Sequence, residues 1–195
     1  MKIIAVGMNY AQHNKELGHT QVNREPVIFM KPDSAILKDG KPFFVPDFSA
    51  EVHYETEVVV RICRLGKNIA PRFAHRYYDA VTVGIDFTAR DLQRKFREAG
   101  NPWELCKGFD NSAAIGTFIP LEQAGGDLQQ LNFHLDIDGK EVQRGNTSGG
   151  CRACQHRATS AGLFRRREVA GLLYPLILFY TLSLSQRKNS GISLR

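Results

Sequence analysis

Two glutamates one residue apart, Glu55 and Glu57, stand at the head of a segment rich in β-branched residues, positions 58–62. Such a segment predicts a buried strand, and residues i and i+2 of a strand face the same side. Both carboxylates therefore point one way. Neighbouring buried carboxylates repel each other unless a positive group lies between them, and Mg²⁺ favours such all-oxygen sites. The spacing also leaves open a solvated pair on an edge strand.

Length and composition predict one globular domain. The chain has 195 residues, of which 43% are hydrophobic and 24% charged, and this is enough to bury a core. An apolar stretch at residues 1–7 is too short for a signal peptide and predicts a first strand. The four cysteines show no disulfide framework, so we expect a reducing, cytoplasmic location.

The sequence changes character after Ser148. Residues 149–195 hold a single acidic residue, Glu168, so the net charge of +6 belongs to this segment. The charge therefore does not indicate a nucleic-acid partner. An apolar stretch at 169–184 falls short of the ~20 residues that span a bilayer, and membrane attachment is the weaker alternative. We expect residues 149–195 to be an anomalous basic and apolar tail to residues 1–148, translated out of frame or otherwise foreign to the fold.

Residues 1–148 read as mainly β with short helices, an α+β class. Asp-Gly pairs at 39–40 and 138–139 predict two hairpins with type I′ turns. A helix is expected from Thr88 to about Ala99, with Thr88 as its cap and Asp91 in a capping-box position.

Three residues around the start of that helix are candidates for a site. Asp86 follows the predicted strand at 81–85, where it suits a ligand or a helix cap equally. Arg90 and Gln93 are three residues apart and share a helix face. They either aim a guanidinium and an amide at a pocket or are solvated.

Three further residues are candidates for catalysis. Lys107 precedes Gly108 among apolar neighbours, where a desolvated ammonium would stabilise an oxyanion or enolate, although most lysines lie on the surface. His13 and Glu16 are three residues apart, so on a helix the carboxylate would orient the imidazole as a base. A surface pair is the alternative.

Together these segments resemble the fumarylacetoacetate hydrolase family, especially its small single-domain acylpyruvase and oxaloacetate decarboxylase members. The matching stretches, in family order, are residues 6–13, 26–32, 53–57, 86–93, 102–110 and 145–148. The family pattern stops at Ser148, so the resemblance implies that residues 1–148 form an incomplete catalytic domain. Met8 stands where many relatives carry an arginine, which puts carboxylate recognition at that point in doubt.

The resemblance implies a set of site residues and a cofactor. Mg²⁺ or Mn²⁺ would be held by Glu55, Glu57 and Asp86. The substrate pocket would be lined by Lys107, Arg90 and Gln93. His13 and Glu16 would form a water-activating dyad on a lid.

The resemblance also implies a fold and an activity. The fold is a mixed β roll, and the assembly a homodimer. The activity is cleavage of a C–C bond in a short 2-oxo acid, by acylpyruvate hydrolysis or oxaloacetate decarboxylation, through an enolate that keeps its Mg²⁺ chelate. Isomerisation of a dienedioate stays open. The alternative is an inactive, truncated family member that only binds metal or another protein.

Overall fold

The computed structural model describes residues 2–7, 27–37, 40–64, 66, 69–149, 176–181 and 186–187. The strands in these ranges are β1 (Lys2–Gly7), β2 (Val27–Lys31), β3 (Ile36–Leu37), β4 (Val52–Ile62), β5 (Tyr78–Ala89), β6 (Ala113–Ile115), β7 (Ile119–Pro120), β8 (Asn132–Ile137), β9 (Lys140–Asn146), β10 (Leu176–Thr181) and β11 (Gln186–Arg187). The helices are α2 (Arg90–Ala99), α3 (Glu104–Lys107) and the 3-10 turns η1 (Asp33–Ala35), η2 (Pro71–Arg76) and η3 (Thr147–Gly149). The predicted class, mainly β with short helices, is confirmed.

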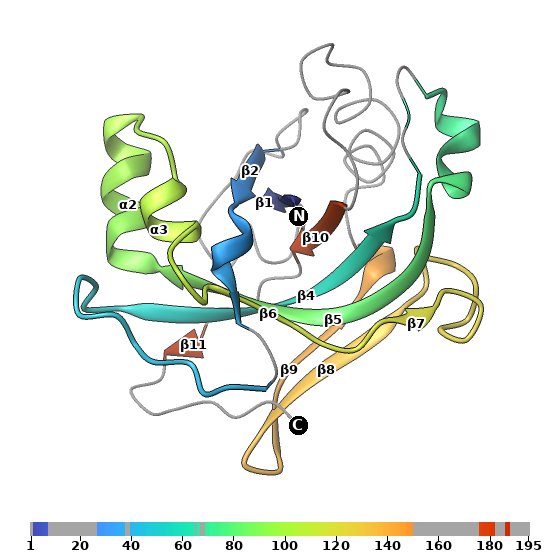
Figure 1. Cartoon of the computed structure of the whole chain (residues 1–195). Helices are drawn as coiled ribbons and strands as arrows, with labels where there is room; N and C mark the ends of the chain where they lie inside the picture. The colour runs from blue at the N-terminus through green and yellow to red at the C-terminus, as the bar shows by residue number, and fades with distance from the viewer. Residues whose placement is uncertain are drawn as a thin grey trace.

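Most described strands form one large sheet. Its order is β2-β1-β10-β4-β5-β6-β3, with β11 beside β4 and β7 beside β5, while β8 and β9 form a separate hairpin. The two longest strands, β4 and β5, pair antiparallel at its centre (Figure 1). The alternative of an edge strand at 53–62 is therefore wrong, because β4 has partners on both sides.

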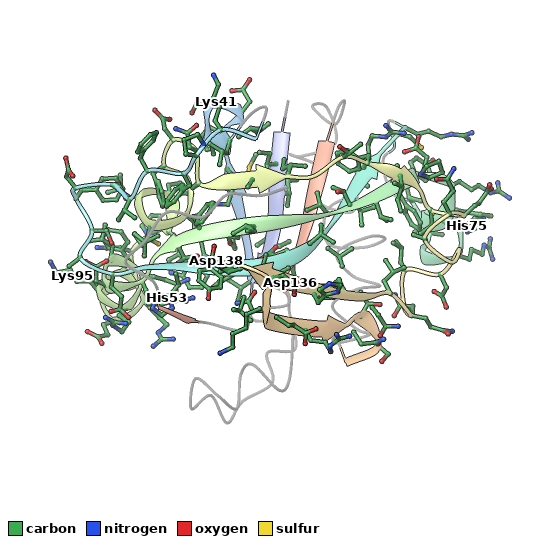
Figure 2. All side chains as sticks on the ribbon, turned by 90° about the horizontal axis from the view of Figure 1, so that it is seen from below. Lys41, His53, His75, Lys95, Asp136 and Asp138 are labelled. Atoms are coloured by element: carbon green, nitrogen blue, oxygen red, sulfur yellow. The ribbon has the colours of Figure 1, made fainter. Side chains whose placement is uncertain are left out.

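The two faces of the sheet are covered differently. On one face, Val58 and Val60 of β4 pack in a buried cluster with Phe133 of β8, so the β8–β9 hairpin covers this face. Figure 2 views the molecule from below, with Asp136 and Asp138 marking the hairpin. On the other face, Val59 packs in a cluster with Trp103, which precedes α3. Alternation along β4 thus separates two layers, and Glu55 and Glu57 share the parity of Val59.

Of the two predicted hairpins, one is confirmed. Asp138 and Gly139 join β8 to β9 with positive φ angles of 52° and 73°, as a type I′ turn requires. The Asp39-Gly40 hairpin is wrong, because β3 pairs in parallel with β6 and residues 41–46 form no strand. Pro42 and Pro46 explain this, since proline lacks the N–H that a ladder needs.

The predicted capping of the helix by Thr88 is also wrong. Thr88 belongs to β5, and α2 begins at Arg90 with Ala89 as its cap residue and no side-chain cap bond. Asp91 instead accepts hydrogen bonds from Ser49 Oγ at 2.6 Å and from the Ala50 N–H at 3.1 Å.

The tail beyond residue 148 contributes strands where it is described. β10 pairs in parallel with β1 and antiparallel with β4, so it lies between them. The division of the chain at residue 148 stays a prediction. No helix in the described ranges is long and apolar enough to cross a membrane.

Candidate metal centre

The three predicted carboxylates meet on the two central strands. Glu55 of β4 is directly opposite Asp86 of β5 in the ladder, and Glu57 follows two residues on. All three are buried, with exposed fractions of 3% or less. One oxygen from each lies within 4.8 Å of the others. Asp86 was expected where the strand gives way to a helix; it instead lies within β5, which continues to Ala89.

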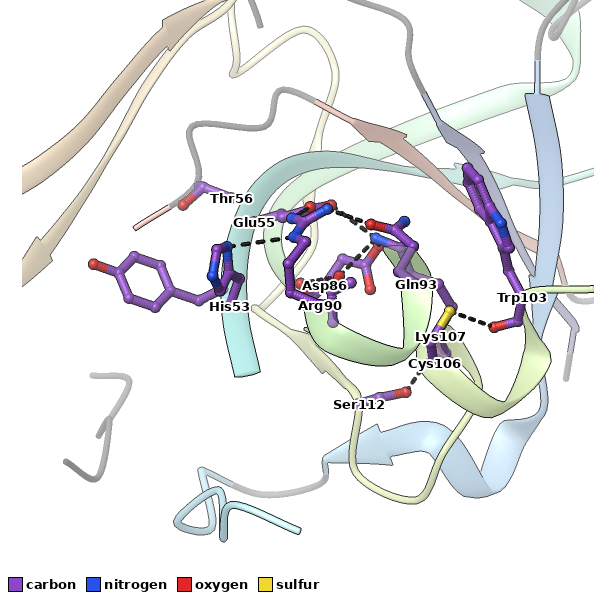
Figure 3. A network of polar contacts seen from close by, with 12 residues as sticks. His53, Glu55, Thr56, Asp86, Arg90, Gln93, Trp103, Cys106, Lys107 and Ser112 are labelled. Carbon is purple, nitrogen blue, oxygen red and sulfur yellow. Dashed lines mark hydrogen bonds and ion pairs between the residues drawn. The ribbon is translucent and has the colours of Figure 1, made fainter. Parts of the chain in front are cut away.

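Lys107 brings a positive charge to this cluster from the end of α3. Its Nζ donates to Glu55 Oε2 at 2.8 Å and to Asp86 Oδ2 at 2.6 Å (Figure 3). It also donates to Thr88 Oγ1 at 2.7 Å. Burial alone would lower the pKa of Lys107, but the attraction of Asp86 and Glu55 outweighs it and raises the pKa. The expectation that this lysine is desolvated is confirmed, since it is 2% exposed.

A second buried lysine, Lys31 at the end of β2, was not anticipated as a site residue. Its Nζ lies 2.7 Å from Asp86 Oδ1 and donates to Ser112 Oγ at 3.0 Å, to the Ser112 carbonyl at 3.1 Å and to the Lys107 carbonyl. Burial lowers the pKa of Lys31, against the attraction of Asp86. Asp86 is thus shared by two ammonium groups.

Arg90, the first residue of α2, forms the third cationic side of the cluster. Its guanidinium pairs with Glu55 Oε1 and donates to Gln93 Oε1, so the predicted Arg90–Gln93 face is directed at the site. Arg90 Nε also donates to His53 Nδ1 at 3.3 Å, and His53 Nε2 lies 2.8 Å from Glu51 Oε1. Burial and the charge of Arg90 lower the pKa of His53, so the neutral ring is favoured.

The donor set fits a hard divalent cation. Carboxylate oxygens are the ligands that Mg²⁺ and Mn²⁺ prefer, and these three converge from two paired strands. The residues that would hold the ion are Glu55, Glu57 and Asp86. The predicted dyad of His13 and Glu16 lies outside the described residues.

Lys31 and His53 are the residues that sequence reasoning missed. Burial along β2 includes Phe29 and Lys31 but not Met30, so strict alternation would have directed Lys31 inward with Phe29. His53 is two residues before Glu55 and shares its face by the same rule. The available signal was strand parity, which was applied only to the glutamates.

Comparison with known proteins finds relatives in one family. The sequence profile described as Fumarylacetoacetate (FAA) hydrolase C-terminal matches residues 2–151. Oxaloacetate tautomerase YcgM of Escherichia coli K12 is 37% identical over 147 residues, covering 75% of this chain and 67% of that protein. The mitochondrial oxaloacetate decarboxylase of Dictyostelium discoideum is 38% identical over 148 residues, with the same coverage.

A solved structure shares the fold. The fumarylpyruvate hydrolase of Pseudomonas aeruginosa, in complex with Mn²⁺ and pyruvate, superposes with a TM-score of 0.76 and 28% identity, covering 100% of this chain and 81% of that one. Against the two curated relatives named in the preceding paragraph, this chain spans about two thirds of their length. By sequence and by fold, it belongs to the fumarylacetoacetate hydrolase family.

Proposed function

We propose that this chain is a Mg²⁺- or Mn²⁺-dependent enzyme of short 2-oxo acids, with oxaloacetate as its substrate. The observation that carries the proposal is the buried triad of Glu55, Glu57 and Asp86, whose oxygens lie within 4.8 Å of one another. Two relatives named for oxaloacetate chemistry and a structural neighbour that holds Mn²⁺ and pyruvate support the choice of metal and substrate.

The charge of the cluster favours an anionic substrate. The three carboxylates are balanced by Lys31, Lys107 and Arg90, all at most 7% exposed. A divalent ion would leave this buried cluster with a formal excess of two positive charges. Because unbalanced buried charge is costly, a dianion such as oxaloacetate would fit the loaded site.

The proposed chemistry divides between the ion and the protein. When bound, the ion supplies a Lewis acid that polarises the ketone and favours enolate charge. Asp86 and Glu55 raise the pKa of Lys107 against the effect of burial. Its ammonium would donate a hydrogen bond to the enolate oxygen in place of one of the three acceptors that it now contacts. Arg90 and Gln93 would bind the remote carboxylate through the guanidinium and amide that already contact each other.

Two reactions of oxaloacetate are compatible with these residues. Tautomerisation would pass through the enolate of oxaloacetate itself, and decarboxylation through the enolate of pyruvate that forms as CO₂ leaves. Neither needs an attacking water. Acylpyruvate hydrolysis is the second candidate, supported by the likeness to fumarylpyruvate hydrolase. It requires an activated water, and His13 with Glu16 is our proposed base and orienting partner for it.

The test measures metal-dependent turnover of the full chain. Ketonisation of enol-oxaloacetate, CO₂ release and loss of acylpyruvate absorbance are followed separately with Mn²⁺, with Mg²⁺ and with EDTA. We expect metal-dependent oxaloacetate turnover, and Glu57→Gln should lower kcat about 100-fold or more by removing a ligand charge. Glu122→Gln, at an exposed turn, serves as the matched control. Metal binding without turnover of any substrate would instead support the inactive, metal-binding alternative.

A further inference from the structure

The side chain of Gln143 connects the hairpin to the backbone that carries the two glutamates. Gln143 lies on β9 and is 4% exposed. Its Nε2 donates to the Tyr54 carbonyl at 3.2 Å, and its Oε1 accepts from the Thr56 N–H at 3.1 Å and from the Thr56 hydroxyl. One amide thus binds β4 on either side of Glu55.

These bonds occupy a particular place in the sheet. On the side of β4 away from β5, β10 pairs with residues 57–62 and β11 with residues 53–54. The Gln143 amide contacts the backbone where these two stretches meet. It offers one acceptor and one donor, as a peptide group of a neighbouring strand would. The side chain therefore continues the ladder of β4 at the segment that bears the metal ligands.

The position of this backbone determines how the ligands converge. Thr56 lies between Glu55 and Glu57, so a shift or twist at Thr56 moves both carboxylates relative to Asp86. When a group that orients metal ligands by hydrogen bonding is removed, metal affinity typically falls 10–100-fold. We infer that Gln143 is a positioning residue of the metal centre, which sets divalent-ion affinity by fixing the β4 backbone between Glu55 and Glu57. This inference rests on the proposed function.

Mn²⁺ affinity, measured by calorimetry on the folded full chain, tests the inference without relying on activity. Gln143→Met keeps the side-chain length but removes both amide bonds. Gln143→Asn keeps the amide but is one methylene too short to reach both backbone groups, so it provides a test if the Met variant does not fold. We expect each variant to weaken Mn²⁺ binding about 10- to 100-fold.

Two controls separate positioning from general weakening of the fold. Gln123→Met makes the same chemical change at an exposed turn residue. Leu135→Ala weakens the packing of the same hairpin, because Leu135 is buried opposite Gln143, and leaves the Thr56 contact in place. Both controls should bind Mn²⁺ within about threefold of the wild-type chain, well below the 10-fold loss expected from removing a positioning group.

The outcomes are distinguishable. If the Gln143 variants bind Mn²⁺ like the wild type, or if Leu135→Ala loses as much affinity as they do, the positioning role is overturned while the metal site stands. If the wild-type chain itself binds no Mn²⁺, the proposed function fails, and this inference fails with it.

Discussion

Asp86 forms two buried ion pairs, because each of its carboxylate oxygens faces a different buried lysine. Lys31 lies 2.7 Å from Oδ1 and Lys107 lies 2.6 Å from Oδ2. Removing one member of a buried ion pair leaves the other charge uncompensated. The stability of the metal-free protein therefore depends on lysines that a divalent ion could partly replace.

We predict that Lys31→Met destabilises the metal-free protein by about 3–5 kcal/mol, as measured by urea unfolding. Mn²⁺ should recover part of the loss, because an ion bound only by the folded state stabilises it and restores positive charge beside Asp86. Lys95→Met, at an exposed position of α2, should leave the unfolding free energy unchanged. An equal loss with saturating Mn²⁺ and with EDTA would contradict the prediction.

At this scale, the sequence predicts the carboxylates better than their partners. Strand parity predicts that Glu55 and Glu57 share one face of β4, and the family resemblance adds their predicted role as metal ligands. Lys31 is more than twenty residues away in the chain and bonds the carbonyls of Lys107 and Ser112. No local pattern encodes a contact that exists only once β2 packs beside α3.

Among the elements, the β8–β9 hairpin supports the site from the opposite face of the sheet. Its turn was predictable because Asp-Gly meets the positive φ angles of a type I′ turn. The contact of the hairpin with β4 could not be predicted, because the Tyr54 carbonyl that Gln143 binds lies about ninety positions earlier in the chain.

We predict that Gly139→Val destabilises the protein by about 1–2 kcal/mol, the cost of a left-handed backbone for a β-branched residue. A Cβ at Gly139 would meet no atom within 4 Å, so the cost is one of conformation and not of collision. Gly139→Asn should lose less, because asparagine tolerates this region. Thermal unfolding measures both variants; equal losses would indicate a different cause.

At the scale of the whole molecule, the pKa values of His53 and Glu51, which share a hydrogen bond, predict that the protein loses stability in acid. Burial lowers the folded pKa of His53 below its ordinary 6.5, and the bond from Arg94 lowers that of Glu51 from 4.5 to about 2. In each case the unfolded chain takes up the proton first as pH falls, so stability is present at neutral pH and lost on acidification.

We therefore predict that the free energy of unfolding falls in two stages below neutral pH. The first begins near pH 6.5 with His53, and the second spans pH 4.5 to about 2 with Glu51. Urea unfolding across this range checks it. His53→Gln should flatten the first stage, and His134→Gln, at an exposed position, should not. A first stage that persists unchanged in His53→Gln would assign it to another group.

The family and the mainly β fold could be predicted from the sequence, because the matching motifs follow one another along residues 1–148. The homodimer and the cytoplasmic location stay predictions. Pairing between distant strands could not be predicted, since β10 enters the sheet between β1 and β4 and nothing local specifies that neighbour.

That placement has a consequence for biosynthesis. A ribosome releases β1 well before β10, yet the ladder from β1 to β4 runs through β10. β1 must therefore wait, unjoined to the centre of the sheet, until residues 176–181 have emerged. Pairings this distant in sequence form slowly, and exposed strand edges invite association in the meantime. The nascent chain is thus most in need of chaperone protection in the interval before residues 176–181 appear.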